Sequence, residues 1–196
     1  MKINKIYSSF TGQVDVGKLA LFIELNNEEG LNKDLDYIKS SIEGFDTIVL
    51  KGNIAEQISD VSNLINSVKK DDHKKVFILY IEGNNKLSKI KNYDNIILNV
   101  EVLLSKTEIE YEDRIKEVDL VWYINMDSNF VFDIIDSDDV DEVNLIVDKF
   151  RIKKNRVYLC PINSDDLGKV LELAKFNGYN FGVDFKRFLW EEKKNG

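Results

Sequence analysis

The sequence predicts an α/β fold built on a mainly parallel β-sheet. Short apolar runs rich in β-branched residues alternate along the chain with amphipathic or polar stretches, as in repeated βα units. The 196 residues fall within the size of one domain, and no boundary interrupts the alternation. We therefore expect a single domain over residues 1–196, with residues 191–196 as a frayed end.

Each expected strand is a short run of Val, Ile, Leu and aromatic residues. In chain order, the expected strands are Ile3–Ser9, Leu19–Leu25, Thr47–Leu50, Lys75–Ile81, Asn95–Val100, Leu120–Ile124 and Arg156–Cys160. The segments between them have helical patterns, the clearest being an apolar stripe within residues 54–70 formed by Ile58, Val61, Leu64, Ile65 and Val68. The expected helices are Lys33–Ile42, Ile54–Lys70, Glu108–Lys116, Val140–Phe150 and Ser164–Asn177, followed by a helical tail from about Phe185.

Composition excludes several classes of protein. The net charge is −8 and no basic arm or Lys/Arg-rich face is visible, which argues against nucleic-acid binding through the phosphate backbone. One cysteine cannot form an internal disulfide, and no apolar run is long enough to cross a bilayer. These features, together with the lack of a basic-then-apolar leader, predict a cytoplasmic protein without a membrane partner.

The N-terminal third carries a recognisable set of motifs. Lys5-Ile6-Tyr7-Ser8-Ser9-Phe10-Thr11-Gly12-Gln13 precedes Gly17-Lys18 and the strand Leu19-Ala20-Leu21-Phe22-Ile23-Glu24-Leu25. This order resembles the opening of 7-carboxy-7-deazaguanine synthases, small radical S-adenosylmethionine enzymes with an S-x-Q-G-E-G loop, an F-V-R-L strand and then C-x-x-x-C-x-x-C-D. Aligning Phe22 to Leu25 with that strand places Glu28, Asn32 and Leu35 at the three cysteine positions. An iron–sulfur cluster needs thiolate ligands, so the chain keeps the order of the family's motifs but lacks the residues that would bind the cluster.

Later segments extend the resemblance and also lack its chemical groups. Where the family has T-G-G-E-P, this chain has Lys51-Gly52-Asn53-Ile54, so a neutral amide replaces a carboxylate that could pair with an ammonium group. Ile81-Glu82-Gly83-Asn84 is similar to the family's E-T-N-G strand end, and Val157-Tyr158-Leu159-Cys160-Pro161 to V-Y-L-Q-P. Near the end, Val183 and Phe185 stand for the Gln and His of G-x-x-x-x-x-Q-x-H-K, and Lys186 is retained.

The resemblance implies an incomplete β/α barrel or curved, mainly parallel sheet, and a pseudoenzyme that has lost both the iron–sulfur cluster and S-adenosylmethionine binding. A residual small-molecule pocket should lie at the carboxyl ends of the strands. Its candidate ligand-binding residues are Gln13, Glu24, Lys51, Gly52, Asn53, Glu82 and Lys186. Glu24 replaces an Arg of the family, and a carboxylate cannot supply the carboxylate-binding fork of Arg.

Two classes of function stay open. The first is a non-catalytic module that binds a small molecule or a protein partner, and the second is an enzyme with redeployed, cluster-independent chemistry. An enzyme would hold ionisable groups such as Glu24, Glu28, Lys51 and Lys186 close together with perturbed pKa values. The resemblance also implies a homodimer, or pairing with an intact relative. The aromatic tail Phe185 to Trp190 is the expected contact.

Four other features have simpler interpretations. Gly12 to Lys18 has P-loop spacing, but Leu19 replaces the magnesium-binding hydroxyl and a strand follows, so we interpret it as a turn. The acidic runs before Val140 and Leu167 are more typical of helix N-termini than of a calcium site. His73 is expected in a solvated turn. Cys160 is expected as a small buried apolar residue.

Overall fold

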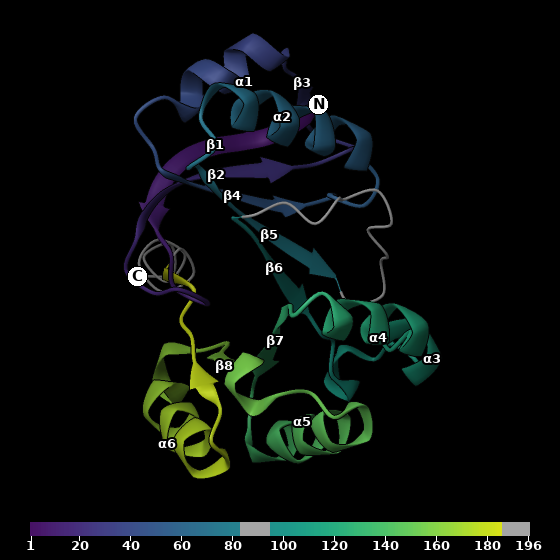
Figure 1. Cartoon of the computed structure of the whole chain (residues 1–196). Coiled ribbons are helices and arrows are strands. Elements are labelled where there is room, and N and C mark those ends of the chain that lie inside the picture. The colour runs from purple at the N-terminus through teal and green to yellow at the C-terminus, as the bar shows by residue number, and fades with distance from the viewer. Residues whose placement is uncertain (83–94, 186–196) are drawn as a thin grey trace. The chain divides into compact units, whose positions relative to one another are not determined.

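The structure is a computed structural model that describes residues 1–81 and 95–185, together with the backbone alone of Glu82 (Figure 1). Contacts divide the chain into two compact units. The described part of the first unit is Met1–Phe10, Lys18–Ile81 and residues 95–98. The described part of the second is Thr11–Gly17 and residues 99–185. The boundary runs through strand β6 (Ile96–Glu101), so that each unit holds part of it.

The first unit is a sheet with two helices. Its strands are β1 (Lys2–Phe10), β2 (Leu19–Leu25), β3 (Leu31–Asn32), β4 (Thr47–Gly52), β5 (Val76–Glu82) and the start of β6, in the order β3-β1-β2-β4-β5-β6. β1 runs antiparallel to β2 and β3, whereas β2, β4 and β5 are parallel. Helices α1 (Leu35–Ile42) and α2 (Ile58–Asp71) bury Ile38 and Ile42 and the stripe Val61, Leu64, Ile65 and Val68.

The second unit continues the parallel pattern. The end of β6 is followed by β7 (Asn129–Ile134), β8 (Val157–Pro161) and β9 (Asn180–Phe181), each parallel to its neighbour. Its helices are α3 (Tyr111–Arg114), α4 (Glu117–Asn125), α5 (Ser137–Phe150) and α6 (Leu167–Asn177). Short 3-10 turns occur at Ser105–Thr107, Lys154–Arg156 and Ser164–Asp166. The predicted fold class is therefore confirmed as α/β with a mostly parallel, open sheet of nine described strands.

One predicted strand is wrong. Leu120–Ile124 lies inside helix α4, and the strand that the prediction missed is β7. The run is rich in β-branched and aromatic residues, but Leu120 and Tyr123 are buried three residues apart while Val118 and Val121 are 75% and 47% exposed. This is the spacing of one buried helix face. Short apolar runs fit either structure until the tertiary contacts decide.

The expected helix Glu108–Lys116 is also wrong in extent, since only the single turn Tyr111–Arg114 is helical there. Strands β3 and β9, two residues each, were not predicted. The other expected elements agree with the structure apart from a few residues at their ends. Single-domain folding of 1–196 stays a prediction. The frayed end at 191–196 and the helical tail beyond Phe185 lie outside the described residues.

The simpler interpretations of the remaining features agree with the structure. Residues 11–18 form a loop with turns before strand β2, with no helix start. Helix α5 begins at Ser137 and is capped by Asp136, whose carboxylate accepts the Asp138 N–H at 2.9 Å, while Asp139 completes a capping box. His73 is exposed in a turn, and Cys160 is buried. Within the described residues, no helix is long and apolar enough to span a membrane.

Candidate functional site

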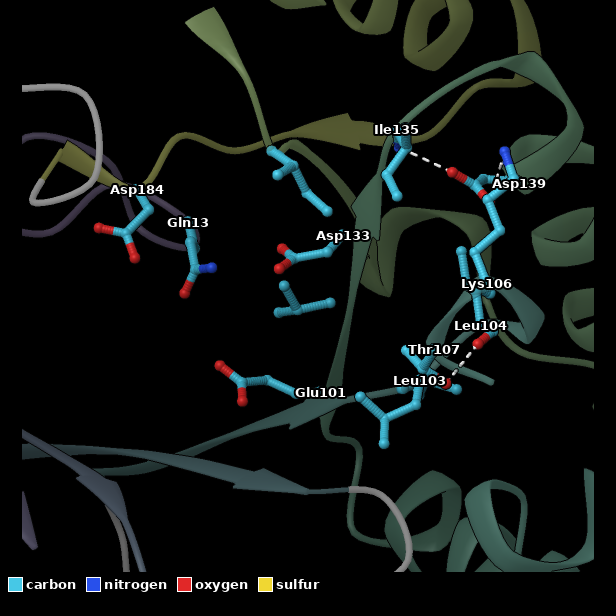
Figure 2. Close-up of a pocket in the computed structure, with 13 residues that line it drawn as sticks. Gln13, Glu101, Leu103, Leu104, Lys106, Thr107, Asp133, Ile135, Asp139 and Asp184 are labelled. Carbon is cyan, nitrogen blue, oxygen red and sulfur yellow. Dashed lines mark hydrogen bonds and ion pairs between the residues drawn. The ribbon is translucent and has the colours of Figure 1, made fainter. Parts of the chain in front are cut away.

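A cavity of about 270 Å³ lies within the second unit (Figure 2). Glu101 ends strand β6, Asp133 is close to the end of β7, and Ile162 follows β8 directly. Since these three strands are parallel, their carboxyl ends meet at one edge of the sheet, where ligands of α/β proteins bind. Gln13, Glu101, Asp133 and Asp184 all line this cavity, and Figure 2 shows Gln13, Glu101 and Asp133 around one space with Asp184 beside Gln13.

Apolar side chains and a polar loop complete the lining. Val102, Leu103, Leu104, Val131, Ile135 and Ile162 supply the apolar part. The loop after β6 contributes Lys106 and Thr107, and the Thr107 hydroxyl donates to the Leu104 carbonyl at 2.7 Å. The cavity thus combines an apolar wall with a few placed polar groups, as small-molecule sites do.

Lys106 is tied to the start of helix α5. Its ammonium forms an ion pair with Asp136 and lies 3.4 Å from Asp139 Oδ1, while Asp139 Oδ2 accepts the Ile135 N–H at 2.7 Å. The hydrogen bond that the Lys106 ammonium donates to Asp136, with smaller contributions from Asp139, raises the pKa of Lys106 above its usual range although burial acts against this. Because its charge is already matched by two carboxylates, Lys106 is held as part of the wall.

Among the predicted ligand-binding residues whose side chains the structure describes, Gln13 is the one that lines this cavity. Glu24 and Lys51 instead lie in the first unit at paired positions of the parallel strands β2 and β4, with Lys51 Nζ 3.8 Å from Glu24 Oε1. The Tyr7 hydroxyl donates to the same carboxylate oxygen at 2.9 Å. The structure therefore brings two predicted ionisable residues together, beside a stacked Tyr7–Phe22 pair.

Gly52 and Asn53 have backbone contacts of their own in the first unit. Gly52 has φ +92°, and a Cβ there would lie 2.2 Å from the Leu25 carbonyl oxygen. The Asn53 N–H donates to the same carbonyl at 3.3 Å, and the Asn53 side chain accepts from the Asn27 N–H at 3.4 Å. The side chain of Glu82 and the whole of Lys186 lie outside the described residues.

The three positions aligned with cluster cysteines lie on the surface of the first unit. Glu28 is exposed in the turn after β2, Asn32 is exposed at the end of β3, and Leu35 is the first residue of α1 with 38% of its surface exposed. Across the described part of the chain, His, Cys, Asp and Glu side chains form no group of three or more that could hold a metal ion.

Sequence analysis missed Glu101, Asp133 and Asp184. The signal for Asp133 was available, since it is a carboxylate near the end of the apolar run Asn129–Ile134. Because that run was not predicted to be a strand, the position of Asp133 near a carboxyl strand end, where ligands bind, followed only from the structure. Asp184 offered no such signal, because its place in the cavity depends on how the segment after β9 packs.

Comparison with known proteins supports the fold alone. No protein-family model and no curated protein matches the sequence. Among solved structures, QueE from Escherichia coli, a radical S-adenosylmethionine protein, is similar over 93% of each chain, with a TM-score of 0.67 and 13% sequence identity. The radical-SAM-like fold implied by the motifs is thus confirmed as a fold, for a sequence whose single cysteine rules out a three-cysteine cluster motif.

Proposed function

We propose that this chain is a non-catalytic, deazaguanine-synthase-like pseudoenzyme that binds a small molecule in the cavity of its second unit. The observation that carries the proposal is that Gln13, Glu101, Asp133 and Asp184 line one cavity at the carboxyl ends of parallel strands. The lack of cluster cysteines supports the loss of radical chemistry, because thiolates hold such clusters.

The lining favours a ligand rich in N–H or O–H donors. Each carboxylate can accept about four hydrogen bonds, so Glu101, Asp133 and Asp184 give the lining a strong hydrogen-bond-acceptor character. The volume of about 270 Å³ is near the lower end of small-molecule sites, which span roughly 300–1,000 Å³. A compact metabolite with several donors and one apolar face fits these properties. A cytoplasmic location agrees with the single cysteine.

Native mass spectrometry of the purified protein tests the proposal. We expect a small molecule to co-purify with wild type and with Glu172→Gln, a change at a carboxylate whose side chain is 69% exposed on helix α6. Asp133→Asn should lose the added mass, since it removes charge from the cavity without changing size. Equal retention by the folded Asp133→Asn protein would contradict the assignment of the cavity.

S-adenosylmethionine provides a second test of the lost cofactor. Asn53 cannot pair with an ammonium group as a carboxylate can, and its side chain is engaged with the Asn27 N–H. We expect no heat of binding in calorimetry at micromolar protein. Tight binding would argue for a methionine-sensing role. Gly52→Val is a poor control for this experiment, because a side chain at residue 52 would overlap the Leu25 carbonyl.

The alternative function is an enzyme with redeployed chemistry in the first unit. The observation in its favour is the 3.8 Å approach of Lys51 to Glu24, with the Tyr7 hydroxyl on the same carboxylate oxygen. Catalytic acids and bases have perturbed pKa values, whereas a structural ion pair at a partly exposed position contributes little. Titration of Glu24 and Lys51 by NMR distinguishes a catalytic pair from a structural ion pair. An upward shift of the Glu24 pKa, or a downward shift of the Lys51 pKa, would favour the enzyme.

A further inference from the structure

The loop Thr11–Gly17 joins β1 to β2 in sequence but packs within the second unit. Its ends are drawn together where the Gly17 N–H donates to the Thr11 carbonyl at 2.8 Å, and the Thr11 hydroxyl donates to the Asp15 carbonyl. Two of its side chains face the sheet of that unit. Gln13 lines the cavity, and Val14, only 3% exposed, packs with Val131 and Cys160.

Two glycines let this loop cross the segment after β9 at unusually short range. A Cβ on Gly12 would lie 1.9 Å from the Val183 carbonyl oxygen, and a Cβ on Gly182 would lie 2.2 Å from the Gln13 carbonyl oxygen. The Val183 N–H donates to the Gly12 carbonyl at 3.0 Å, and the Gly182 N–H donates to Leu159 of β8 at 3.0 Å. Only residues without a Cβ can occupy both sides of such a crossing.

The crossing places the cavity residues. Gln13 follows Gly12 and Asp184 follows Val183, so one backbone contact brings an amide and a carboxylate from distant parts of the sequence to the same side of the cavity (Figure 2). Cys160 lies directly below, since its sulfur would be 2.8 Å from a Cβ at Gly182. Asp133 and Cys160 are register partners on neighbouring strands, so the covered face is the one that carries Asp133.

We propose that Thr11–Gly17 is a strap held over this sheet face, with Gly12 and Gly182 as positioning residues that set Gln13 and Asp184 in the cavity. The strap also seals Cys160, which is 1% exposed. Loosening the crossing between this loop and the segment after β9 should therefore have two effects at once. It should expose the thiol of Cys160 and displace Gln13 from the cavity. The effect on the cavity rests on the proposed binding function, whereas the sealing of Cys160 does not.

The test is the rate at which Cys160 reacts with 5,5′-dithiobis(2-nitrobenzoate) in the folded protein. Gly12→Ala and Gly182→Ala should each raise that rate by about tenfold or more, since local opening becomes easier. Hydrogen exchange at the Gly182 and Val183 amides should accelerate in the same variants. Gly168→Ala is the matched control, because a Cβ there meets no atom within 4 Å, and it should react at the wild-type rate.

A second control separates local opening from loss of stability. Val143→Ala removes buried volume from helix α5 of the same unit, at a residue outside both crossing segments, and it should leave the Gly182 and Val183 amides protected. If the alanine variants at the glycines do not fold, Val14→Ala takes their place, since it thins the cover over Cys160 and should also speed the thiol reaction. If folded Gly12→Ala and Gly182→Ala, or Val14→Ala, react with the reagent at the wild-type rate, the proposed strap is contradicted.

The cavity readout is separate. A co-purified small molecule found by native mass spectrometry should be retained by Gly168→Ala and lost from Gly182→Ala. If wild type carries no molecule, the proposed binding function fails, while the thiol and exchange rates still decide whether the strap exists. If Gly182→Ala reacts fast at Cys160 but still retains the small molecule in full, the role of the glycines in placing Gln13 is refuted.

Discussion

Glu24 accepts a hydrogen bond from the Tyr7 hydroxyl at 2.9 Å through the carboxylate oxygen that lies 3.8 Å from the Lys51 ammonium. The three residues come from β1, β2 and β4 of the first unit, and Glu24 is 14% exposed. A partly buried carboxylate with a hydroxyl donor is a stabilising contact in its own right, whatever further role the group has.

Tyr7→Phe should therefore lower the free energy of unfolding by about 1–2 kcal/mol, since it removes a hydrogen bond to a charged group and keeps the ring that stacks on Phe22 at 5.3 Å. Urea denaturation gives the value. Tyr37→Phe, at a ring that is 48% exposed on helix α1, is the control and should change stability by less than about 0.5 kcal/mol. Equal losses in the two variants would show that the contact with Glu24 contributes nothing.

Anaerobic reconstitution with iron and sulfide should leave the protein colourless. Cluster binding needs several thiolates, and Glu28, Asn32 and Leu35 supply none while Cys160 is buried in the second unit. Absorbance spectroscopy and sulfide analysis after gel filtration provide the measurement. Stoichiometric sulfide that stays with the protein would overturn the pseudoenzyme proposal.

Gly52→Ala should destabilise the protein more than Gly44→Ala. Both glycines have positive φ, +92° and +86°, so alanine costs about 1–2 kcal/mol at either position. Only at Gly52 would the new Cβ meet backbone, 2.2 Å from the Leu25 carbonyl oxygen, whereas nothing lies within 4 Å at Gly44. The overlap should add about 1–3 kcal/mol. Thermal denaturation of the two variants measures the difference. Identical melting temperatures would show that the backbone of β2 at Leu25 shifts to accept the new Cβ without loss of stability.

Glu142 should make stability dependent on pH in the acidic range. Burial raises the pKa of Glu142, but hydrogen bonds from Ser105 and Arg114 outweigh it, so the net pKa is lowered. A lowered folded-state pKa means that the contribution is present above the unfolded pKa, about 4.3, and is lost as pH falls through the folded value. Glu142→Gln should cost about 1–3 kcal/mol at pH 7, since it weakens the pairing of the buried Arg114 guanidinium.

The cost of Glu142→Gln should shrink when unfolding is measured at progressively lower pH below about 4. Glu172→Gln is the control, since its pair with Lys175 has side chains that are 69% and 65% exposed, and it should have little effect at any pH. A constant loss from pH 7 to pH 3 would mean that the charge of Glu142 is not what stabilises Arg114.

Phe188→Asp tests the proposed homodimer through the tail Phe185 to Trp190, most of which lies outside the described residues. The sequence places Phe185, Phe188 and Leu189 at helical spacing, so an aspartate should disrupt an apolar contact. We expect a shift from dimer to folded monomer in light scattering. Phe176→Asp, at a ring 90% exposed on helix α6, is the matched control and should not change the mass. An unchanged mass with a lower melting temperature for Phe188→Asp would place the tail in the monomer.

The sequence by itself determined the fold class and most elements of this protein. Parallel strands such as β4 and β8 are nearly continuous apolar runs, because a strand covered on both faces tolerates few polar side chains, and such runs can be read without coordinates. The amphipathic stripe of α2 is equally local, since its spacing follows from helix geometry alone. The missing cysteines are likewise a property of the sequence.

Only the tertiary structure decided between Leu120–Ile124 and Asn129–Ile134 as the strand, because both are short apolar runs and the hydrogen-bonding partner β6 selects one of them. It also decided the cavity. Gln13 and Asp184 lie far apart in sequence and line one cavity because Gly12 and Gly182 allow two backbones to cross. Glu101 and Asp133 line the same cavity because parallel strands align their carboxyl ends. Side chains gathered by packing leave no periodic signal in the chain, so their grouping appears only when the strands are in register.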